Sequence, residues 1–196
     1  MAAFTPISAA TAAVTNRFVT SVNMANGAYT IANASPTFAG GVLIVATITG
    51  VTGNDTPGTL TVVGTDLAGN VITEVITLVA GGTATGAKVF RSVTSATQAG
   101  WIINTGNDTI VVGHGAGSIV CGTSGVLYAV VVNATAAATV VIADSVKTIA
   151  TLKVSIAEGH YIYGPGVDCT GYIKVTTTST NDITVIHSPT AVSSGV

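Results

Sequence analysis

The stretch GTLTVVGTDLAGNVITEVITL, residues 58–78, decides the fold class of this chain. Two runs rich in Thr, Val and Ile, residues 59–64 and 70–79, flank a turn sequence that contains Asp66 and Asn70. β-Branched side chains pack well on a pleated sheet but lose rotamer freedom in a helix, and Asp, Gly and Asn are typical of turns. The stretch therefore predicts a β-hairpin.

Similar β-branched runs, bounded by Gly, Asn, Asp or Pro, recur along the rest of the chain. Short strands at such regular spacing are typical of antiparallel β-sandwiches. The other predicted strands are residues 28–32, 42–49, 88–94, 101–104, 109–112, 126–133, 139–143, 148–154, 160–163, 172–177 and 183–187.

Two internal echoes suggest that the chain contains a repeated unit. Residues 41–46 (GVLIVA) are similar in character to residues 125–130 (GVLYAV), and residues 107–112 (NDTIVV) are similar to residues 181–186 (NDITVI). Between the two series lies the glycine-rich run 113–118, which we interpret as a linker.

These observations predict an all-β protein with two small antiparallel β-sandwich domains, Ig-like or jelly-roll-like. We expect the first domain over residues 25–116 and a second, smaller one over residues 117–196. Residues 1–24 are rich in Ala, Thr, Ser and Asn, which predicts an extended N-terminal arm held by a neighbouring chain. A single large sandwich is the alternative organisation.

Composition limits the function classes open to this chain. Its 196 residues are 48% hydrophobic but only 7% charged, against about 25% charged in an ordinary soluble domain. The apolar run 42–48 is far shorter than the roughly 20 residues of a membrane-spanning helix, and the six basic residues are scattered. We therefore expect no membrane and no nucleic acid as partner, and a homo-oligomer, trimer or dimer, that covers apolar surface.

Residues suited to catalysis are present but not arranged in a catalytic pattern. His114, His160 and His187 are far apart in sequence, and Glu74 and Glu158 are the only glutamates. No nucleophile stands beside a base in a recognisable motif, and most of the six aspartates follow or precede turn residues. We predict that the protein is not an enzyme and has no catalytic, cofactor-binding or metal-binding residues.

Three further features have a structural interpretation and a functional alternative. Cys121 and Cys169 have no metal-ligand spacing, so we interpret them as small buried side chains, with a disulfide as the alternative. The run 113–117 lacks the Lys-Ser/Thr ending of a phosphate-binding loop. Aromatic side chains are expected as core and interface anchors, with a sugar-binding surface as the alternative; they are Tyr29, Trp101, Tyr161, Tyr163 and Tyr172.

The chain resembles β-rich virion proteins of tailed bacteriophages, above all capsid decoration (cement) proteins. The resemblance rests on residues 58–78, 88–95, 107–113, 125–132 and 181–185. It implies a non-enzymatic protein that binds the major capsid protein or other virion proteins, bridges capsomers on the outer capsid surface and stabilises the DNA-filled head. Such a protein is made in the host cytoplasm. The alternative is a head-fibre, neck or tail component, with or without recognition of a glycan on the host surface.

Overall fold

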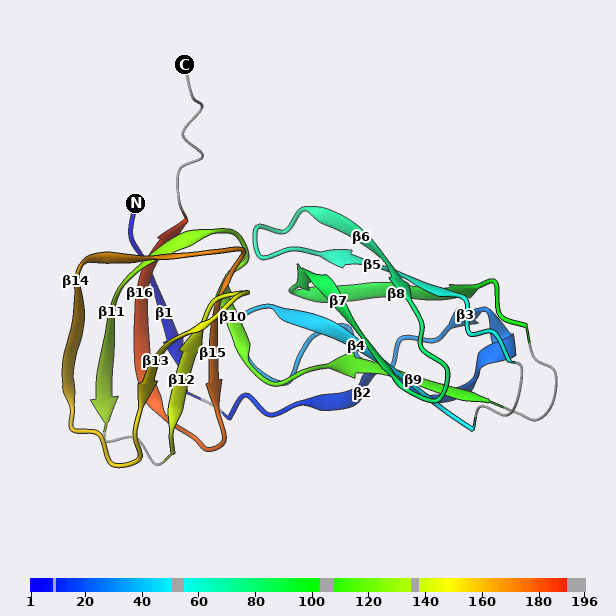
Figure 1. Ribbon diagram of the computed structural model, residues 1–196, viewed down its shortest axis with the longest axis horizontal. Helices are drawn as coiled ribbons and strands as arrows, with labels where there is room; N and C mark the ends of the chain where they lie inside the picture. Colours follow the sequence, from blue (N-terminus) through cyan, green and yellow to red (C-terminus); the bar gives the residue numbers. More distant parts are fainter. Residues whose placement is uncertain (9, 51–54, 103–107, 135–137, 190–196) are drawn as a thin grey trace, which may run out of the picture. The chain divides into compact units, whose positions relative to one another are not determined.

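The computed structural model describes residues 1–8, 10–50, 55–102, 108–134 and 138–189. Within these residues the chain is almost entirely β, with every sheet antiparallel (Figure 1). The all-β fold class is therefore confirmed. The helical part of the described chain is a single 3-10 turn, η1 (Met24–Asn26), and no described helix has the length and apolar character needed to cross a membrane.

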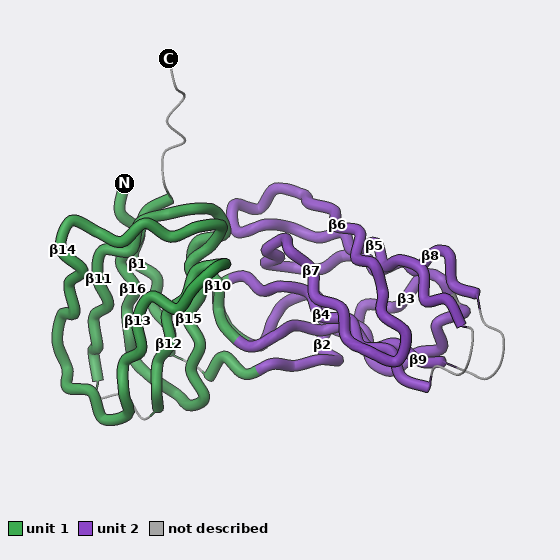
Figure 2. Tube along the Cα trace, in the orientation of Figure 1, with its two compact units in different colours: residues 1–12, 38–40, 117–196 green, residues 13–37, 41–116 purple. Residues whose placement is uncertain are grey.

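The chain divides into two compact units, which Figure 2 shows in different colours. Unit 1 contains residues 1–12, 38–40 and 117–196, and unit 2 contains residues 13–37 and 41–116. Unit 2 is therefore inserted in the sequence of unit 1, between its first and second strands.

Unit 2 contains eight described strands in two four-stranded sheets. The strand orders are β2-β9-β4-β7 and β3-β8-β5-β6. The strands are β2 (Val14–Asn23), β3 (Ala28–Tyr29), β4 (Val42–Thr49), β5 (Thr59–Thr65), β6 (Val71–Thr77), β7 (Thr83–Phe90), β8 (Ser92–Ala99) and β9 (Thr109–His114).

Unit 1 likewise contains eight described strands in two four-stranded sheets. The strand orders are β1-β16-β11-β14 and β10-β15-β12-β13. The strands are β1 (Ala3–Ile7), β10 (Ser118–Cys121), β11 (Gly125–Ala134), β12 (Val140–Ala143), β13 (Thr148–Leu152), β14 (Gly159–Cys169), β15 (Ile173–Thr177) and β16 (Asp182–Pro189).

The two units have the same topology. In each, the first, eighth, third and sixth strands form one sheet, and the second, seventh, fourth and fifth form the other. This is the strand order of a jelly roll, in which two Greek keys form a double sheet. The sequence echoes fall on equivalent strands, because β4 and β11 are the third strands and β9 and β16 are the eighth.

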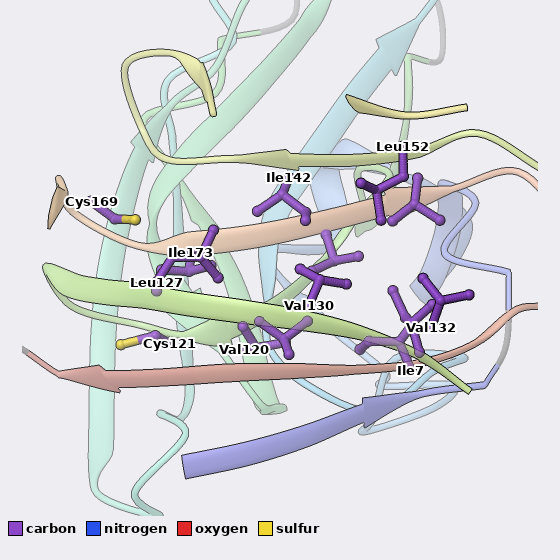
Figure 3. Close-up of a cluster of buried hydrophobic side chains, with 14 residues drawn as sticks. Ile7, Val120, Cys121, Leu127, Val130, Val132, Ile142, Leu152, Cys169 and Ile173 are labelled. Atoms are coloured by element: carbon purple, nitrogen blue, oxygen red, sulfur yellow. The ribbon is translucent and has the colours of Figure 1, made fainter. Parts of the chain in front are cut away.

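The core of unit 1 combines side chains from both of its sheets (Figure 3). β11 contributes the fully buried Leu127 and Val130, which face Ile142 and Ile173 of the other sheet. Strict alternation would point residues 127 and 130 to opposite faces, but the pairing register of β11 shifts between Leu127 and Ala129. This β-bulge adds a residue and keeps both side chains inward.

The structure differs from the expected extended arm over residues 1–24. β1 pairs with β16 in unit 1, and β2 pairs with β9 in unit 2. Ile7, Phe18 and Val19 are buried in these sheets. A segment rich in Ala, Thr and Ser looks like a loose tail when read alone, but here strands far along the same chain supply its hydrogen-bond partners.

Several predicted strands also differ from the structure. Of residues 28–32, only Ala28–Tyr29 form a strand, β3. Residues 88–94 contain the end of β7 and the start of β8, which are separated at Arg91. In the predicted strand 101–104, Ile102 forms an isolated bridge with Thr56, and residues 103–104 lie outside the described residues.

The predicted linker over residues 113–118 is shorter in the structure, because Gly113 and His114 belong to β9 and Ser118 begins β10. A Cβ atom at Gly113 would lie 2.0 Å from the carbonyl oxygen of Val14 and 2.4 Å from the carbonyl carbon of Thr15. Glycine is therefore required at position 113 for the close approach of β2 to β9.

Candidate functional site

Two of the three histidines are buried and occupy equivalent places in the two units. His114 ends β9, and its Nδ1 donates a hydrogen bond to the carbonyl of Gly115 at 2.9 Å. His187 lies near the end of β16, with Nε2 hydrogen-bonded to Thr5 Oγ1 at 3.0 Å. Burial lowers the pKa of both rings, which favours the neutral form of each imidazole. His160 is exposed on β14.

Glu74 is a buried carboxylate that connects the two sheets of unit 2. It lies in β6, and its Oε1 accepts hydrogen bonds from the main-chain N–H groups of Ala87 (2.5 Å) and Lys88 (3.1 Å) in β7. A Cβ at Gly86 would collide with the same carboxylate, 2.4 Å from Oε2. The other glutamate, Glu158, is exposed and belongs to unit 1. These contacts give Glu74 a structural role.

Two aspartates begin the turns between the fourth and fifth strands of the two units. Asp66 Oδ1 accepts hydrogen bonds from Ala68 N and Asn70 N, both at 2.9 Å, as expected for a turn former. The side-chain amide and main-chain N–H of Asn70 lower the pKa of Asp66. Asp144 begins the corresponding turn of unit 1 and is buried. Both hairpins therefore use a carboxylate to fix the turn.

Asp55 and Asp108 also stand beside turn residues in the sequence, but they differ from Asp66 and Asp144 in their surroundings. Asp108 is 0% exposed and Asp55 is 7% exposed. Burial, followed by the hydrogen bond and the charge of the adjacent Asp55 carboxyl, raises the pKa of Asp108. The fold therefore brings together two buried acids that are 53 positions apart in the sequence, which no motif had indicated.

The two cysteines are free and buried in the core of unit 1. Cys121 Sγ donates to the carbonyl of Thr123 at 3.3 Å, and Cys169 Sγ donates to the carbonyl of Val167 at 3.4 Å. Burial raises the pKa of the Cys169 thiol. Both behave as small apolar side chains, and the alternative disulfide is not formed.

Three of the tyrosines considered for a sugar-binding surface, Tyr29, Tyr161 and Tyr163, pack into the protein interior. Tyr29 is buried, its hydroxyl donates to the carbonyl of Met24 at 3.2 Å, and burial raises its pKa to about 12. Tyr161 and Tyr163 pack against the core of unit 1. The ammonium group of Lys174 lies 5.9 Å from the ring centroid of Tyr172.

Several exposed apolar side chains lie on strands at the edges of sheets, and others lie in turns and loops. In β6, an edge strand, Val71 is 75% exposed and Val75 is 61% exposed, and they alternate with the exposed Thr73 and Thr77. We call these four residues the β6 stripe. The edge strand β14 of unit 1 exposes Ile162 to 71%. The alternation of Val and Thr in the sequence was the signal for the stripe, but only the structure shows that its strand is at an edge.

Within the described part of the chain, no group of three or more His, Cys, Asp and Glu side chains lies together as a metal cluster. Comparison of the chain with protein-family models, with curated proteins and with solved structures finds no match.

Proposed function

We propose that this chain is a non-enzymatic structural protein of a tailed-phage virion, working as a capsid decoration protein. It binds the outer capsid surface, bridges neighbouring capsomers and stabilises the DNA-filled head. The observation that carries the proposal is the β6 stripe, an uncharged and exposed row of β-branched side chains at a sheet edge. Exposed apolar side chains aligned on one face of an edge strand, here Val71 and Val75, favour an interaction at that edge.

The jelly-roll strand order supports the proposal by analogy, since viral capsid proteins use this architecture. Lectins use it as well, but the buried Tyr29 and the core-packed Tyr161 and Tyr163 do not favour glycan binding.

The energy of such binding comes from buried area repeated over many copies. Burial of apolar surface contributes roughly 25 cal/mol per Å² before the costs of association are subtracted. A single stripe gives a modest contact, but a capsid presents the same contact at every lattice position. The small net charge of −2 leaves little electrostatic repulsion between neighbouring copies.

The test is binding of the purified chain to phage heads that lack it, measured by co-sedimentation and by antibody labelling of the particles in electron micrographs. We expect saturable binding at a fixed number of copies per head. The double substitution Val71→Lys and Val75→Lys should abolish binding, because it places two charges in the apolar contact. The matched control is Thr148→Lys with Thr151→Lys, two exposed positions of β13, which should bind as wild type does.

Failure of the wild-type chain to bind heads would overturn the decoration role. Equal binding by the Val71/Val75 variant would overturn the role of the β6 stripe. Binding to host glycans in an array, with no binding to heads, would favour the fibre, neck or tail alternative.

A further inference from the structure

A row of apolar side chains crosses all four strands of one sheet of unit 1, β1, β16, β11 and β14 (Figure 1). Phe4 of β1 stands opposite Ile186 of β16. Ala129 of β11 stands opposite both Ile186 and Ile162, the latter in β14. Residues directly opposite each other in antiparallel strands project from the same face, with Cβ atoms about 4.5–5.5 Å apart. These four side chains therefore lie side by side, and we call them the apolar row.

The apolar row lies on the outer face of its sheet. Val130 belongs to the core of unit 1, so its neighbour in β11, Ala129, projects from the opposite face. At the two ends of the row, Phe4 is 67% exposed and Ile162 is 71% exposed. Single exposed apolar side chains are normal on a protein surface, but a row that spans a whole sheet favours an interaction there.

The jelly-roll fold does not itself require apolar side chains at these places. The buried histidines of the two units align Ile186 with Gly113, since each directly precedes one of them. Gly113 stands opposite Val45, which in turn stands opposite Thr85. Unit 2 thus exposes Thr85 where unit 1 exposes Ile162. The apolar row is therefore a property of this surface of unit 1 and not of the architecture.

The centre of this face carries no charge. Its four strands contain no Lys, Arg or Glu. Their two acids lie at opposite ends of the sheet, because Asp168 pairs with Val126 near the start of β11 and Asp182 pairs with Ala134 at its end. Burying an unpaired carboxylate is costly, but a surface that packs over the apolar row leaves both acids at its rim. The face can therefore pack against a copy of itself without opposing like charges at the centre.

The area of the face is sufficient for a dimer. Four strands about 4.8 Å apart, and the eight residues of β16 at about 3.4 Å each, give a face of roughly 500 Å². Two such faces together bury roughly 1,000 Å², the lower limit of a specific interface. An interface of this size is expected to hold a reversible dimer, with a Kd in roughly the micromolar range.

We propose that the outer face of the β1-β16-β11-β14 sheet, centred on the apolar row, packs against the same face of a second copy of this chain. A face that packs against itself forms a closed, two-fold dimer, and β-sheets pack face to face in this way in sandwiches. This dimer goes beyond the proposed virion role, which depends on the β6 stripe of unit 2, and it uses a different surface.

The test is sedimentation velocity of the purified full chain over roughly a hundredfold range of concentrations around the micromolar range. The wild type should change from monomer to dimer as its concentration rises. Ile162→Lys and Phe4→Lys should each raise the Kd of the dimer by about tenfold or more, because each buries a charge in the apolar contact. Ile162→Leu keeps the apolar surface and should dimerise as the wild type does.

The matched control is Thr85→Lys, which adds the same charge at the corresponding exposed position of unit 2 and should leave the dimer unchanged. Thermal unfolding in dilute solution, where the chain is monomeric, checks that the variants fold. Because Phe4 and Ile162 are exposed in the single chain, both lysine variants should melt close to the wild type there.

Three results would overturn the proposal. The first is a wild-type chain that stays monomeric at every concentration, and the second is a trimer, which a two-fold contact cannot form. The third is a dimer whose Kd is the same in the wild type, Ile162→Lys and Phe4→Lys, since the copies would then meet through another surface.

Discussion

Lys88 donates a hydrogen bond from Nζ to the main-chain carbonyl of Thr73, at 2.7 Å. Thr73 lies in β6, at the edge of one sheet of unit 2, and Lys88 lies in β7 of the other sheet. An unpaired carbonyl on an edge strand is a template for pairing with another chain, and a lysine placed there protects it. The β6 stripe therefore exposes two apolar side chains while the Thr73 carbonyl behind it is already hydrogen-bonded.

Replacing Lys88 with Met should increase self-association, because the substitution frees the Thr73 carbonyl and removes a charge beside an apolar edge. Sedimentation velocity should show species larger than those of the wild type. The control Lys153→Met removes the same charge from an exposed position in unit 1 and should sediment as the wild type does. Identical profiles for both variants would contradict the protective role of Lys88.

Replacing Gly86 with Ala should lower the free energy of unfolding by about 1–3 kcal/mol, the usual cost of forcing extra atoms into a packed site. The new Cβ would displace the Glu74 carboxylate from the N–H groups of Ala87 and Lys88. Urea denaturation measures the change. Gly115→Ala is the matched control, because the nearest atom to its Cβ would be a methyl carbon of Val45 at 3.6 Å. Equal stability of the two variants would contradict the need for glycine at position 86 beside the Glu74 carboxylate.

Replacing Asp144 with Ala should cost about 1–3 kcal/mol, because three main-chain N–H groups lose the partly buried carboxylate that accepts their hydrogen bonds. Asp144 Oδ1 accepts from Val146 N and Lys147 N at 2.7 Å, and Oδ2 accepts from Thr170 N at 3.1 Å. Asp66→Ala, in the equivalent but exposed turn, should cost less. Chemical denaturation of both variants checks the order, and a larger loss for Asp66→Ala would refute it.

The Asp144 carboxylate should also make the stability of the protein depend on pH. Burial alone would raise the pKa of Asp144, but hydrogen bonds from Lys147, Thr170 and Val146 prevail and lower it. Its contribution to stability is therefore present above the unfolded pKa of about 3.9 and is lost as the pH falls through the folded value. Below that pH, the difference between wild type and Asp144→Ala should shrink.

Acidification should also lower the stability of the folded protein by protonating His187. Burial lowers the pKa of this ring, so the folded state binds a proton less readily than the unfolded state, whose histidine pKa is about 6.5. The stability contribution is present above that value and is lost as the pH falls through the folded pKa. His187→Gln should reduce the loss of stability between about pH 7 and pH 5, measured by thermal unfolding in matched buffers. His160→Gln, at an exposed position, should lose as much stability over this pH range as the wild type does. An equal loss in His187→Gln and the wild type would contradict the role of His187.

The local elements of the fold were predictable because their signals lie within a few residues of one another. The hairpin expected from residues 58–78 is realised as β5 and β6, which pair in uninterrupted register from Thr59 opposite Thr77 to Thr65 opposite Val71. Asp66, Gly69 and Asn70 form its turn. The echoes of residues 41–46 in 125–130 mark the third strands of the two units, because equivalent buried strands need similar apolar patterns.

The candidate sites were less predictable, because a side chain's role depends on what the fold places against it. Glu74 interrupts an apolar face in the sequence, but its two donors come from β7. Asp55 and Asp108 both look like turn formers beside polar residues, and nothing local distinguishes them from Asp66. Their burial and mutual approach arise only when the two sheets of unit 2 face each other.

The sequence by itself determined that this chain is all-β, since its many Val, Ile and Thr side chains pack well on a pleated sheet and lose rotamer freedom in a helix. Tertiary structure alone decided which strands pair. β1 pairs with β16, and Thr5 meets His187 across 182 residues, so a segment with the composition of a tail becomes part of a sheet. The physical reason is that strand hydrogen bonds are made by the backbone, which carries no record in the sequence of its distant partner.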